Sequence, residues 1–511
     1  MEQPPVLVVG AGPTGLVAAF ELSRMGVEVR IVDMAPQPST TSRALGVQAR
    51  TLELLRPRGV SDELVRLGNE ARRTALHANG HRIAALDFTR MHSQFPYILL
   101  LAQSETERVL TEHLARQGVK VERGVQFSSL TEESDATQVV LTAADGTLET
   151  VEASYVIAAD GSHSTVRKFL GLPFTGRALP QNYVLGDVHV DGGMAEDQLS
   201  IFLAAKGFLA VFPMGDGRFR LMATDPDGIT GGAEQPSSTD VQTLLTRAVG
   251  GSVRLRGLDW SSRFRINSRH LETLRVGRVF FGGDSAHVHS PAGGQGMNAG
   301  IQDMINLSWK LAMVLRGAGR PELLDTYESD RLPVIRRLVG MTERATRVFN
   351  STNPLAHAVL TRLAPLALAQ SAVQDRAVPQ LGQIAASYRG APITKGGGAI
   401  GGLRAGDRVP DAAIDGVDGV RVPGGVALHD LIDITTPTLL VSGGCTGIVE
   451  AAQPWAGTLE VREVALPDDL VPGPGWLLVR PDGHLAAAGQ AGDADRLRDW
   501  LDRWMVPRIV D

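Results

Sequence analysis

Three glycines near the N-terminus have the spacing that dinucleotide binding requires. Gly10, Gly12 and Gly15 follow the apolar run 6–9, which predicts a buried parallel strand, and a helix is predicted after them. Glycines at these places allow a tight turn, a close approach of backbone to a pyrophosphate, and close packing of helix on strand. The helix start favours an anion. Asp33 ends the next predicted strand, where a carboxylate can bind a ribose, so the pattern predicts a bound ADP group. An ordinary strand–turn–helix connection is the alternative.

Two later segments bear on whether the dinucleotide is NAD or FAD. In the first, a predicted strand at 155–159 runs into Asp160 and Gly161. In the second, a predicted strand at 276–281 runs into Asp284 and the glycine-rich stretch SAHVHSPAGGQGMN. Asp284 can bind a ribityl or ribose hydroxyl, and the glycines let bare backbone lie against a flat ring. The start of a long helix, predicted over 298–316, would stabilise negative charge on that ring.

These three segments together resemble the FAD-dependent aromatic hydroxylases, the single-component flavoprotein monooxygenases with the p-hydroxybenzoate hydroxylase fold. Arg43 in SRALGVQARTLELL and Gln103 in LLLAQSETERVL match the same family. The motifs cover about residues 4–345. The C-terminal part is similar to the thioredoxin-like domain of phenol hydroxylase and the polyketide hydroxylases.

The resemblance implies a set of cofactor contacts. Residues that match Gly10–Gly15 hold the FAD pyrophosphate, the acid that matches Asp33 holds the adenosine ribose, and the stretch that matches Pro291–Asn298 lines the isoalloxazine. The implied FAD contacts are Gly10, Gly12, Pro13, Gly15, Asp33, Arg43, Gln103, Asp160, Asp284, Pro291, Gly294, Gly296, Met297 and Asn298. His163 and Arg167 are the candidates for contact with NAD(P)H, for which the sequence holds no second dinucleotide motif.

The resemblance also implies a reaction. NADPH or NADH reduces the flavin, the reduced flavin reacts with O2 to give a C4a-hydroperoxide, and its distal oxygen passes to a phenolic or polyketide aromatic ring. The protein excludes water, orients the ring and favours the phenolate. Baeyer–Villiger insertion or oxidative dehalogenation of a halophenol on the same scaffold is the alternative. An NAD-dependent dehydrogenase, which the 284–298 segment argues against, and a catalytically idle binding protein are the alternatives of other classes.

The substrate side is less defined by the sequence. Phe202, Phe212 and Met214 are candidates for an aromatic pocket, and core packing is an equal alternative for them. Arg220 and Pro291 are the only candidates for a catalytic role, and Arg220 could equally form a surface ion pair. No Tyr or His stands out as the base for a phenol.

The predicted fold is α/β with three parts. A Rossmann-like FAD-binding domain covers 1–178 and 272–345, and a mostly antiparallel β-sheet substrate domain is inserted at 179–271. A helical segment and the glycine-rich linker KGGGAIGG follow at 346–400, and a thioredoxin-like domain covers 401–511. In this last domain the sequence predicts a hairpin over 476–487, with its turn at 481–483, and a closing helix over 494–504. Within the first part, Ser104 and Glu107 have the spacing of a helix capping box.

Composition excludes several classes of protein. The 511 residues carry a net charge of −6 with scattered basic residues, which argues against nucleic-acid binding. No apolar run is long enough to span a membrane, and no signal peptide is visible, so a cytoplasmic protein is expected. The single Cys445 allows no internal disulfide, and a structural or dimer-contact role is expected for it. Asp284, His287 and His289 could be a metal cluster, but a flavin motif explains all three, so no metal is predicted. The expected partner is a small aromatic substrate, and a homodimer is left open.

Overall fold

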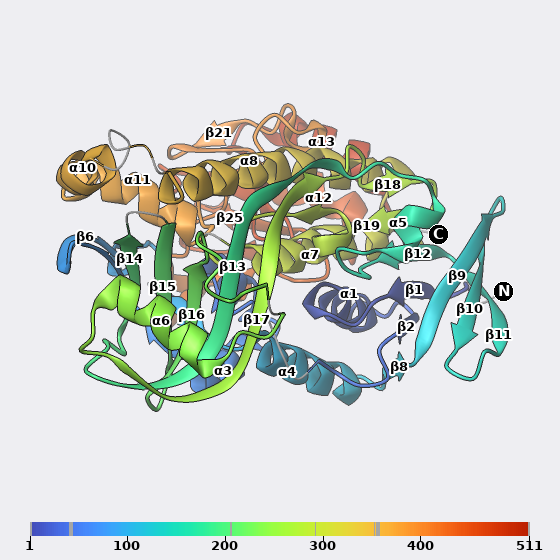
Figure 1. The fold of residues 1–511 in the computed structure, drawn as a ribbon. Coiled ribbons are helices and arrows are strands. Elements are labelled where there is room, and N and C mark those ends of the chain that lie inside the picture. The colour runs from blue at the N-terminus through green and yellow to red at the C-terminus, as the bar shows by residue number, and fades with distance from the viewer. Residues whose placement is uncertain are drawn as a thin grey trace.

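The computed structural model describes residues 3–39, 44–204, 207–232, 234–291, 293–351, 353 and 358–508 (Figure 1). Arg43, predicted to contact FAD, lies outside these residues. Among them, no helix is both long enough and apolar enough to cross a membrane.

A six-stranded sheet forms the centre of the first part, in the order β18-β19-β12-β1-β2-β8. Its strands are β1 (Val6–Val9), β2 (Val29–Asp33), β8 (Val121–Arg123), β12 (Tyr155–Ala158), β18 (Arg275–Val276) and β19 (Val279–Phe281). β1 lies between β2 and β12 and is parallel to both. All four residues of β1 and all four of β12 are buried, as expected for parallel strands covered on both faces.

Helices pack beside this sheet. They are α1 (Pro13–Arg24), α4 (Gln103–Arg116), α7 (Gly296–Leu315) and α8 (Thr326–Phe349), and α1 and α7 lie next to each other in Figure 1. The predicted capping box at Ser104 is wrong. α4 begins one residue earlier, after Ala102, so Ser104 falls inside the first turn. Glu107 instead accepts a hydrogen bond of 2.7 Å from the side chain of Gln103, one turn before it.

The second sheet has eight strands in the order β20-β17-β13-β16-β15-β14-β5-β6. They are β5 (Arg73–Ala78), β6 (His81–Asp87), β13 (Thr175–Asp191), β14 (Gln198–Ala204), β15 (Gly207–Gly215), β16 (Arg218–Thr224), β17 (Arg254–His270) and β20 (His287–Val288). All neighbours are antiparallel except β14 and β5. The helix α6 (Ser238–Val249) packs on β14, β15 and β17. Strands from outside 179–271 therefore complete the sheet at both edges.

Smaller elements connect these parts. Two three-stranded sheets contain β9 (Val125–Glu132), β10 (Thr137–Ala143) and β11 (Leu148–Ala153), and β3 (Gly46–Val47), β4 (Asn69–Ala71) and β7 (Ile98–Leu100). The short helices are α2 (Ala49–Leu55), α3 (Ser61–Leu67) and α5 (Thr165–Phe169). In the segment predicted as helical, α10 (Ala364–Leu368) and α11 (Ser371–Leu381) pack against β6.

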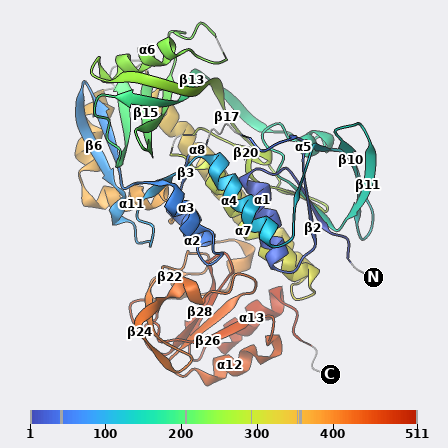
Figure 2. The ribbon, with the colours of Figure 1, turned by 90° about the horizontal axis from the view of Figure 1, so that it is seen from below.

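The C-terminal part packs beneath α2, α3 and α7 (Figure 2). Its four-stranded sheet, β26-β25-β27-β28, consists of β25 (Thr438–Ser442), β26 (Glu460–Glu463), β27 (Gly475–Val479) and β28 (Leu485–Gln490). The helices α12 (Thr446–Ala452) and α13 (Ala494–Trp504) accompany it. The predicted hairpin around 481–483 and the closing helix 494–504 are confirmed.

The glycine-rich segment 395–402 is not a free linker. The backbone N–H of Ala488 donates to the Gly397 carbonyl at 2.8 Å, and Gly398 accepts from Ala405. A Cβ at Gly397 would lie 2.4 Å from the Ala486 carbonyl oxygen, so its lack of a side chain serves close packing. These glycines belong to the C-terminal unit and do not form a hinge, because β28 lies directly against them.

Candidate functional site

A cleft of about 370 Å³ lies where the two large sheets meet. Of the predicted FAD contacts, it is lined by Gly12, Pro13, Gln103, Asp284, Pro291, Gly294, Gly296 and Met297. Arg220 and Phe212 reach it from the second sheet. The cleft therefore brings together predicted cofactor residues and part of the predicted substrate wall.

The glycine-rich turn after β1 has the tight geometry that its sequence predicts. A Cβ at Gly15 would lie 1.9 Å from the Gly10 carbonyl oxygen, and one at Gly10 would lie 2.4 Å from that of Ala159. A Cβ at Gly12 would meet no atom within 4 Å, so this residue leaves room for a ligand. No side chain caps the N-terminus of α1, whose first residues face the cleft. Such a helix start favours an anion.

Asp33 lies behind this turn. Its Oδ2 accepts a hydrogen bond of 2.6 Å from the backbone N–H of Ala11, and Arg123 lies 3.6 Å from its Oδ1. The carboxylate at the end of β2 therefore also stabilises the glycine-rich turn, and it does not itself line the cleft.

The three residues predicted after β12 to contact FAD or NAD(P)H do not line the cleft. Asp160 uses Oδ2 to cap α5, accepting from Thr165, while its Oδ1 is buried with no partner among the described residues. Arg167 is buried and donates to the carbonyls of Ser285 and Ser162 at 2.8 and 2.7 Å. Arg167 therefore stabilises the turn that carries Asp284, because both of these bonds end on backbone carbonyls. His163 is exposed outside the cleft.

The loop 293–298 is held in place by two side-chain amides, of which one, Asn298, was predicted to contact FAD and the other, Gln48, was not predicted to have a role. Asn298 is fully buried, and its amide donates to Gly46 and Gly294 at 2.8 and 2.9 Å while accepting from the Gln48 N–H. Its side chain thus connects two loops and does not face the cleft. Gln48 adds a bond of 2.7 Å to the Gly293 carbonyl. Gln48 was missed, although it lies in the same SRALGVQARTLELL segment as Arg43, and a polar residue inside that apolar run was the available signal.

A second buried group was also missed. Asp303 of α7 accepts from His287 Nε2 at 2.7 Å and from Arg331 Nε at 2.7 Å. Burial acts to raise the pKa of Asp303, but Arg331 and His287 outweigh it and bring the pKa to about 2. His287 Nε2 is therefore hydrogen-bonded to a carboxylate that does not line the cleft.

Arg220 sits in the wall of the cleft and not on the surface. It is 2% exposed and forms two parallel bonds to Asp187, Nε–Oδ1 at 2.7 Å and Nη2–Oδ2 at 2.8 Å. Trp260 donates to the same carboxylate at 2.7 Å, and Arg220 Nη1 donates to the Ala44 carbonyl at 3.1 Å. Arg220 therefore joins the substrate-side sheet to the loop after residue 43. A lone acid in the apolar strand YVLGDVHV was the signal for Asp187.

Of the three residues predicted to line a substrate pocket, only Phe212 lines the cleft. Phe212 lines the cleft with other apolar side chains, namely Leu185, Met222, Phe264 and Ile266. Phe202 instead stacks on His77, with ring centroids 4.6 Å apart, and Met214 packs against the main hydrophobic core. Phe202 pairs with Leu209 and so points to the face of the sheet opposite Phe212, because alternate residues of a strand point to opposite faces. Met214 lies where the pairing register of β15 shifts, after Pro213, and does not line the cleft either.

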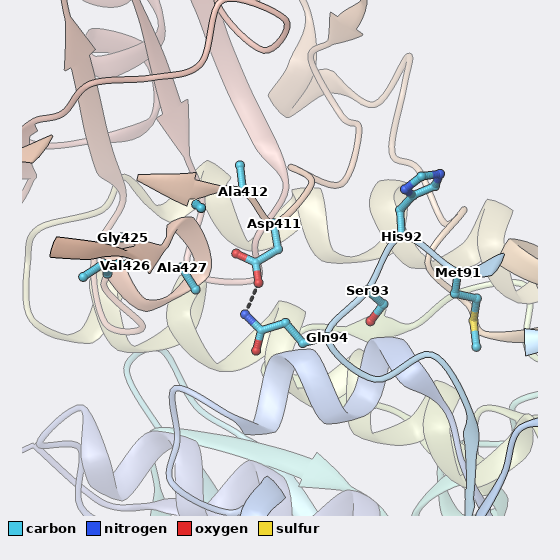
Figure 3. Close-up of a pocket in the computed structure, with 11 residues that line it drawn as sticks. Met91, His92, Ser93, Gln94, Asp411, Ala412, Gly425, Val426 and Ala427 are labelled. Atoms are coloured by element: carbon cyan, nitrogen blue, oxygen red, sulfur yellow. Dashed lines mark hydrogen bonds between the residues drawn. The ribbon is translucent and has the colours of Figure 1, made fainter. Parts of the chain in front are cut away.

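A second hollow, of about 500 Å³, lies between residues 91–94 and the C-terminal unit (Figure 3). Gln94 and Asp411 are hydrogen-bonded across it. None of the predicted cofactor residues lines this hollow, so it is a different feature from the cleft.

The residues of the cleft fit an FAD molecule. Two helices, α1 and α7, begin at it without a side-chain cap, which suits a pyrophosphate and an electron-rich ring. Gly293 and Gly294 both have the left-handed backbone (φ +86° and +63°), so bare backbone forms the loop at 293–294. Beside the cleft, Asp160 Oδ1 and Gln48 Oε1 are buried acceptors without partners among the described residues.

Comparison with known proteins agrees with this geometry. A model of the FAD binding domain family matches residues 3–342, and one of the aromatic-ring hydroxylase C-terminal family matches 403–507. The chain belongs to the FAD-dependent aromatic-ring hydroxylases. It is therefore a flavoprotein monooxygenase that uses FAD and O2, with NAD(P)H as the reductant typical of this class, and not an NAD-dependent dehydrogenase.

Relatives of this aromatic-ring hydroxylase act on different rings. It is 37% identical to 6-methylpretetramide 4-monooxygenase of Streptomyces rimosus, over 95% of this chain and 91% of that one. It is 32% identical to pentachlorophenol 4-monooxygenase of Sphingobium chlorophenolicum, over 88% and 81%. The solved anhydrotetracycline hydroxylase OxyS of Streptomyces rimosus superposes with a TM-score of 0.81, at 29% identity, over 99% of this chain and all of that one.

Proposed function

We propose that this hydroxylase adds one oxygen atom to a phenolic ring of a bulky, fused-ring polyketide. The observation that carries the proposal is the two-sided cleft, which has glycine loops, Asp284 and Gln103 on one side and the apolar wall around Phe212 on the other. Burial of flat apolar surface on that wall favours a large aromatic molecule. The tetracycline-type substrates named for two of its relatives support the same class.

We propose that FAD lies along the glycine side, in the part formed by 1–178 and 272–345. The turn Gly10–Gly15 would hold its pyrophosphate, Asp33 its adenosine ribose, and Asp284 a hydroxyl of its chain. Backbone from Pro291 to Met297 would face the ring. When bound, FAD supplies the activation of O2 for transfer to the substrate.

The substrate would lie against the sheet of 179–271, which β5 and β6 extend. Its wall excludes water from the reacting ring, and the buried Arg220–Asp187 pair keeps that wall in place against the loop after residue 43. A homodimer and a location in the cytoplasm stay predictions from the sequence.

A turnover screen tests the proposal. The purified protein should be yellow and should consume NADH or NADPH in the presence of phenols or polyketide quinols, with a product heavier by one oxygen. The structure of the product then distinguishes ring hydroxylation from Baeyer–Villiger insertion. A colourless protein that cannot be reconstituted with FAD, or FAD-loaded protein that oxygenates none of these rings, would overturn the proposal.

Oxidative dehalogenation is the second candidate, and the similarity to pentachlorophenol 4-monooxygenase favours including it. Chlorophenols belong in the same screen, with chloride release as the readout. Release of chloride together with oxygen incorporation would favour this candidate over a polyketide substrate.

A further inference from the structure

His289 presents an unused nitrogen at the cleft. Its ring Nδ1 lies 2.8 Å from the Ser290 carbonyl oxygen, so Nδ1 carries the proton and Nε2 keeps its lone pair. Nε2 is shielded from solvent and has no hydrogen-bond partner among the described residues. His289 itself lines the cleft, and a Cβ at Gly296 would lie 3.7 Å from Nε2. A buried acceptor is therefore held beside the loop at which the flavin ring is proposed to lie.

The surroundings keep this imidazole neutral. Burial is the main cause that lowers the pKa of His289, to about 4, and His287 adds to it, with the two rings nearly parallel and 6.4 Å apart. His287 is paired with Asp303 behind the cleft. The other charged groups of the cleft are Asp284, Arg220 and Arg265. At neutral pH the Nε2 lone pair is therefore available to a donor.

A donor from the substrate accounts for this nitrogen. A buried acceptor without a partner costs roughly 1 to 3 kcal/mol, so buried acceptors are normally paired. The substrate-side lining around Phe212 and Met222 is mainly apolar, and none of the donors near it, which include Arg220, Arg265 and Asn267, is hydrogen-bonded to Nε2. An aromatic molecule seated on that wall brings its ring hydroxyl to this part of the cleft.

We propose that His289 Nε2 accepts the hydrogen bond of the substrate's ring hydroxyl and takes its proton as the ring gains oxygen. This inference rests on the proposed phenol hydroxylation. A lone pair of the hydroxyl oxygen moves into the ring while a ring carbon bonds to one oxygen atom of O2, which two electrons from NAD(P)H have reduced; the O–O bond breaks and the other oxygen atom leaves as water. The hydroxyl proton passes to Nε2, which leaves a ketone. When that ring carbon loses its hydrogen as a proton and the ring becomes aromatic again, the imidazolium returns its proton to the ketone oxygen.

A weakly basic imidazole is suited to this step. Before oxygen transfer the phenol is a far weaker acid than an imidazolium, so the proton stays on the phenol and the pair is a neutral hydrogen bond. Once the ring has given up its electron pair, the protonated ketone is strongly acidic, and even a base with a pKa of about 4 accepts its proton. The proton therefore passes to His289 only once oxygen transfer has made the ring hydroxyl strongly acidic.

Nitrogen NMR of the FAD-loaded protein tests the contact without turnover. With ¹⁵N-labelled histidine, the Nε2 signal of His289 is identified by its loss in His289→Gln. Saturating 1-naphthol, whose binding is followed by the flavin absorbance, should move this signal upfield, and naphthalene, which lacks the hydroxyl, should not move it. A signal unchanged by bound 1-naphthol overturns the inference, as does one that responds to FAD binding alone.

Single-turnover oxygen transfer tests the proton step. With 1-naphthol at pH 7, His289→Gln should keep its FAD and its rate of reduction by NAD(P)H but transfer oxygen about 100-fold more slowly. The loss should shrink as the pH rises and the naphthol ionises, because a phenolate needs no proton acceptor. His92→Gln, an exposed histidine at the hollow of Figure 3, is the matched control and should behave as wild type.

Two results would overturn this role: wild-type oxygen transfer by His289→Gln at pH 7, or a loss that is the same at every pH. If the wild-type protein oxygenates no phenol in the screen, the proposed function fails by itself, and the NMR experiment still decides whether His289 binds a ring hydroxyl.

Discussion

Arg480 of the C-terminal unit forms a buried ion pair with Asp330 of α8, Nη2 to Oδ2 at 2.8 Å, with both side chains fully shielded from solvent. Lys310 donates to the same Asp330 oxygen at 2.7 Å, and Arg480 also binds Asp482 in the turn of its own hairpin. The final unit is thus attached to the helices behind the cleft by charges that have no access to water. This attachment gives the C-terminal unit, whose single cysteine excludes dithiol chemistry, a structural role.

Replacing Arg480 should weaken the attachment of this unit and lower the stability of the protein. Arg480→Met leaves the carboxylates of Asp330 and Asp482 buried without the guanidinium that binds them both, and should lower the free energy of unfolding by roughly 3 to 5 kcal/mol. Urea denaturation measures the change. Arg462→Met, which breaks an exposed pair with Asp418, should cost less than about 1 kcal/mol. Equal losses in the two variants would contradict the assignment.

Acid should destabilise the protein through two buried carboxylates. Burial raises the pKa of Glu53, but Arg408 and Arg50 outweigh it and lower it to about 2, and the pKa of Asp303 is also about 2. Because these values lie below those of the unfolded chain, the carboxylates stabilise the fold fully above about pH 4.5. The contribution, roughly 2 to 3 kcal/mol each, is lost as the pH falls toward 2.

Denaturation at pH 7, 5, 4 and 3 measures this loss. Glu53→Gln should be less stable at pH 7 and should lose less of its remaining stability on acidification. An unfolding free energy that is constant between pH 5 and 3 would contradict the prediction.

Gly15 should tolerate no side chain. Gly15→Ala places a methyl group 1.9 Å from the Gly10 carbonyl oxygen, so the turn after β1 must open. The protein should then be purified with little or no FAD, as measured by its flavin absorbance per chain. Gly340→Ala, at a helical position where a Cβ meets no atom within 4 Å, should keep full flavin content. Normal flavin content in Gly15→Ala would contradict the proposed pyrophosphate site.

FAD binding should depend on the planar guanidinium of Arg220 and not on its charge alone. Arg220→Lys keeps the charge but cannot hold both Asp187 oxygens and the Ala44 carbonyl, so the FAD dissociation constant should rise by roughly 10-fold. Quenching of flavin fluorescence measures it. Arg218→Lys, on the same strand with an exposed pair to Asp259, is the control and should bind FAD as wild type does. Equal affinity in both variants would show that Arg220 does not position the loop.

Cys445 should be dispensable for redox chemistry. Its thiol is buried at the start of α12 and donates to the Ser442 carbonyl at 3.2 Å, and burial raises its pKa. The flavin bound to the Cys445→Ala variant should therefore be reduced by NAD(P)H at the wild-type rate, as followed by loss of flavin absorbance. Slower reduction in a fully flavin-loaded variant would assign the thiol a function that its position does not explain.

The local features of the two glycine motifs were predictable from the sequence alone. Strand, turn and helix around Gly10–Gly15 follow from short-range periodicity and from glycine's lack of a Cβ, and the long helix after Asp284 follows from the same kind of pattern. The resemblance in those motifs was sufficient for the family. The closing helix of the C-terminal unit has its predicted bounds, and the hairpin before it was predicted to within three residues.

The long-range partners were not predictable in this way. Asn298 meets Gly46, Arg220 meets Asp187, and Arg480 meets Asp330, each through pairing or packing of segments far apart in the chain. The same applies to Phe202 and Met214, whose residue types suit a pocket but whose strand positions place them outside the cleft. The sequence by itself determined which backbone could approach a cofactor, because that depends on local sterics. Only the tertiary structure decided which side chains face the cleft and which are used to hold it together, because burial and charge pairing depend on what the whole fold brings alongside.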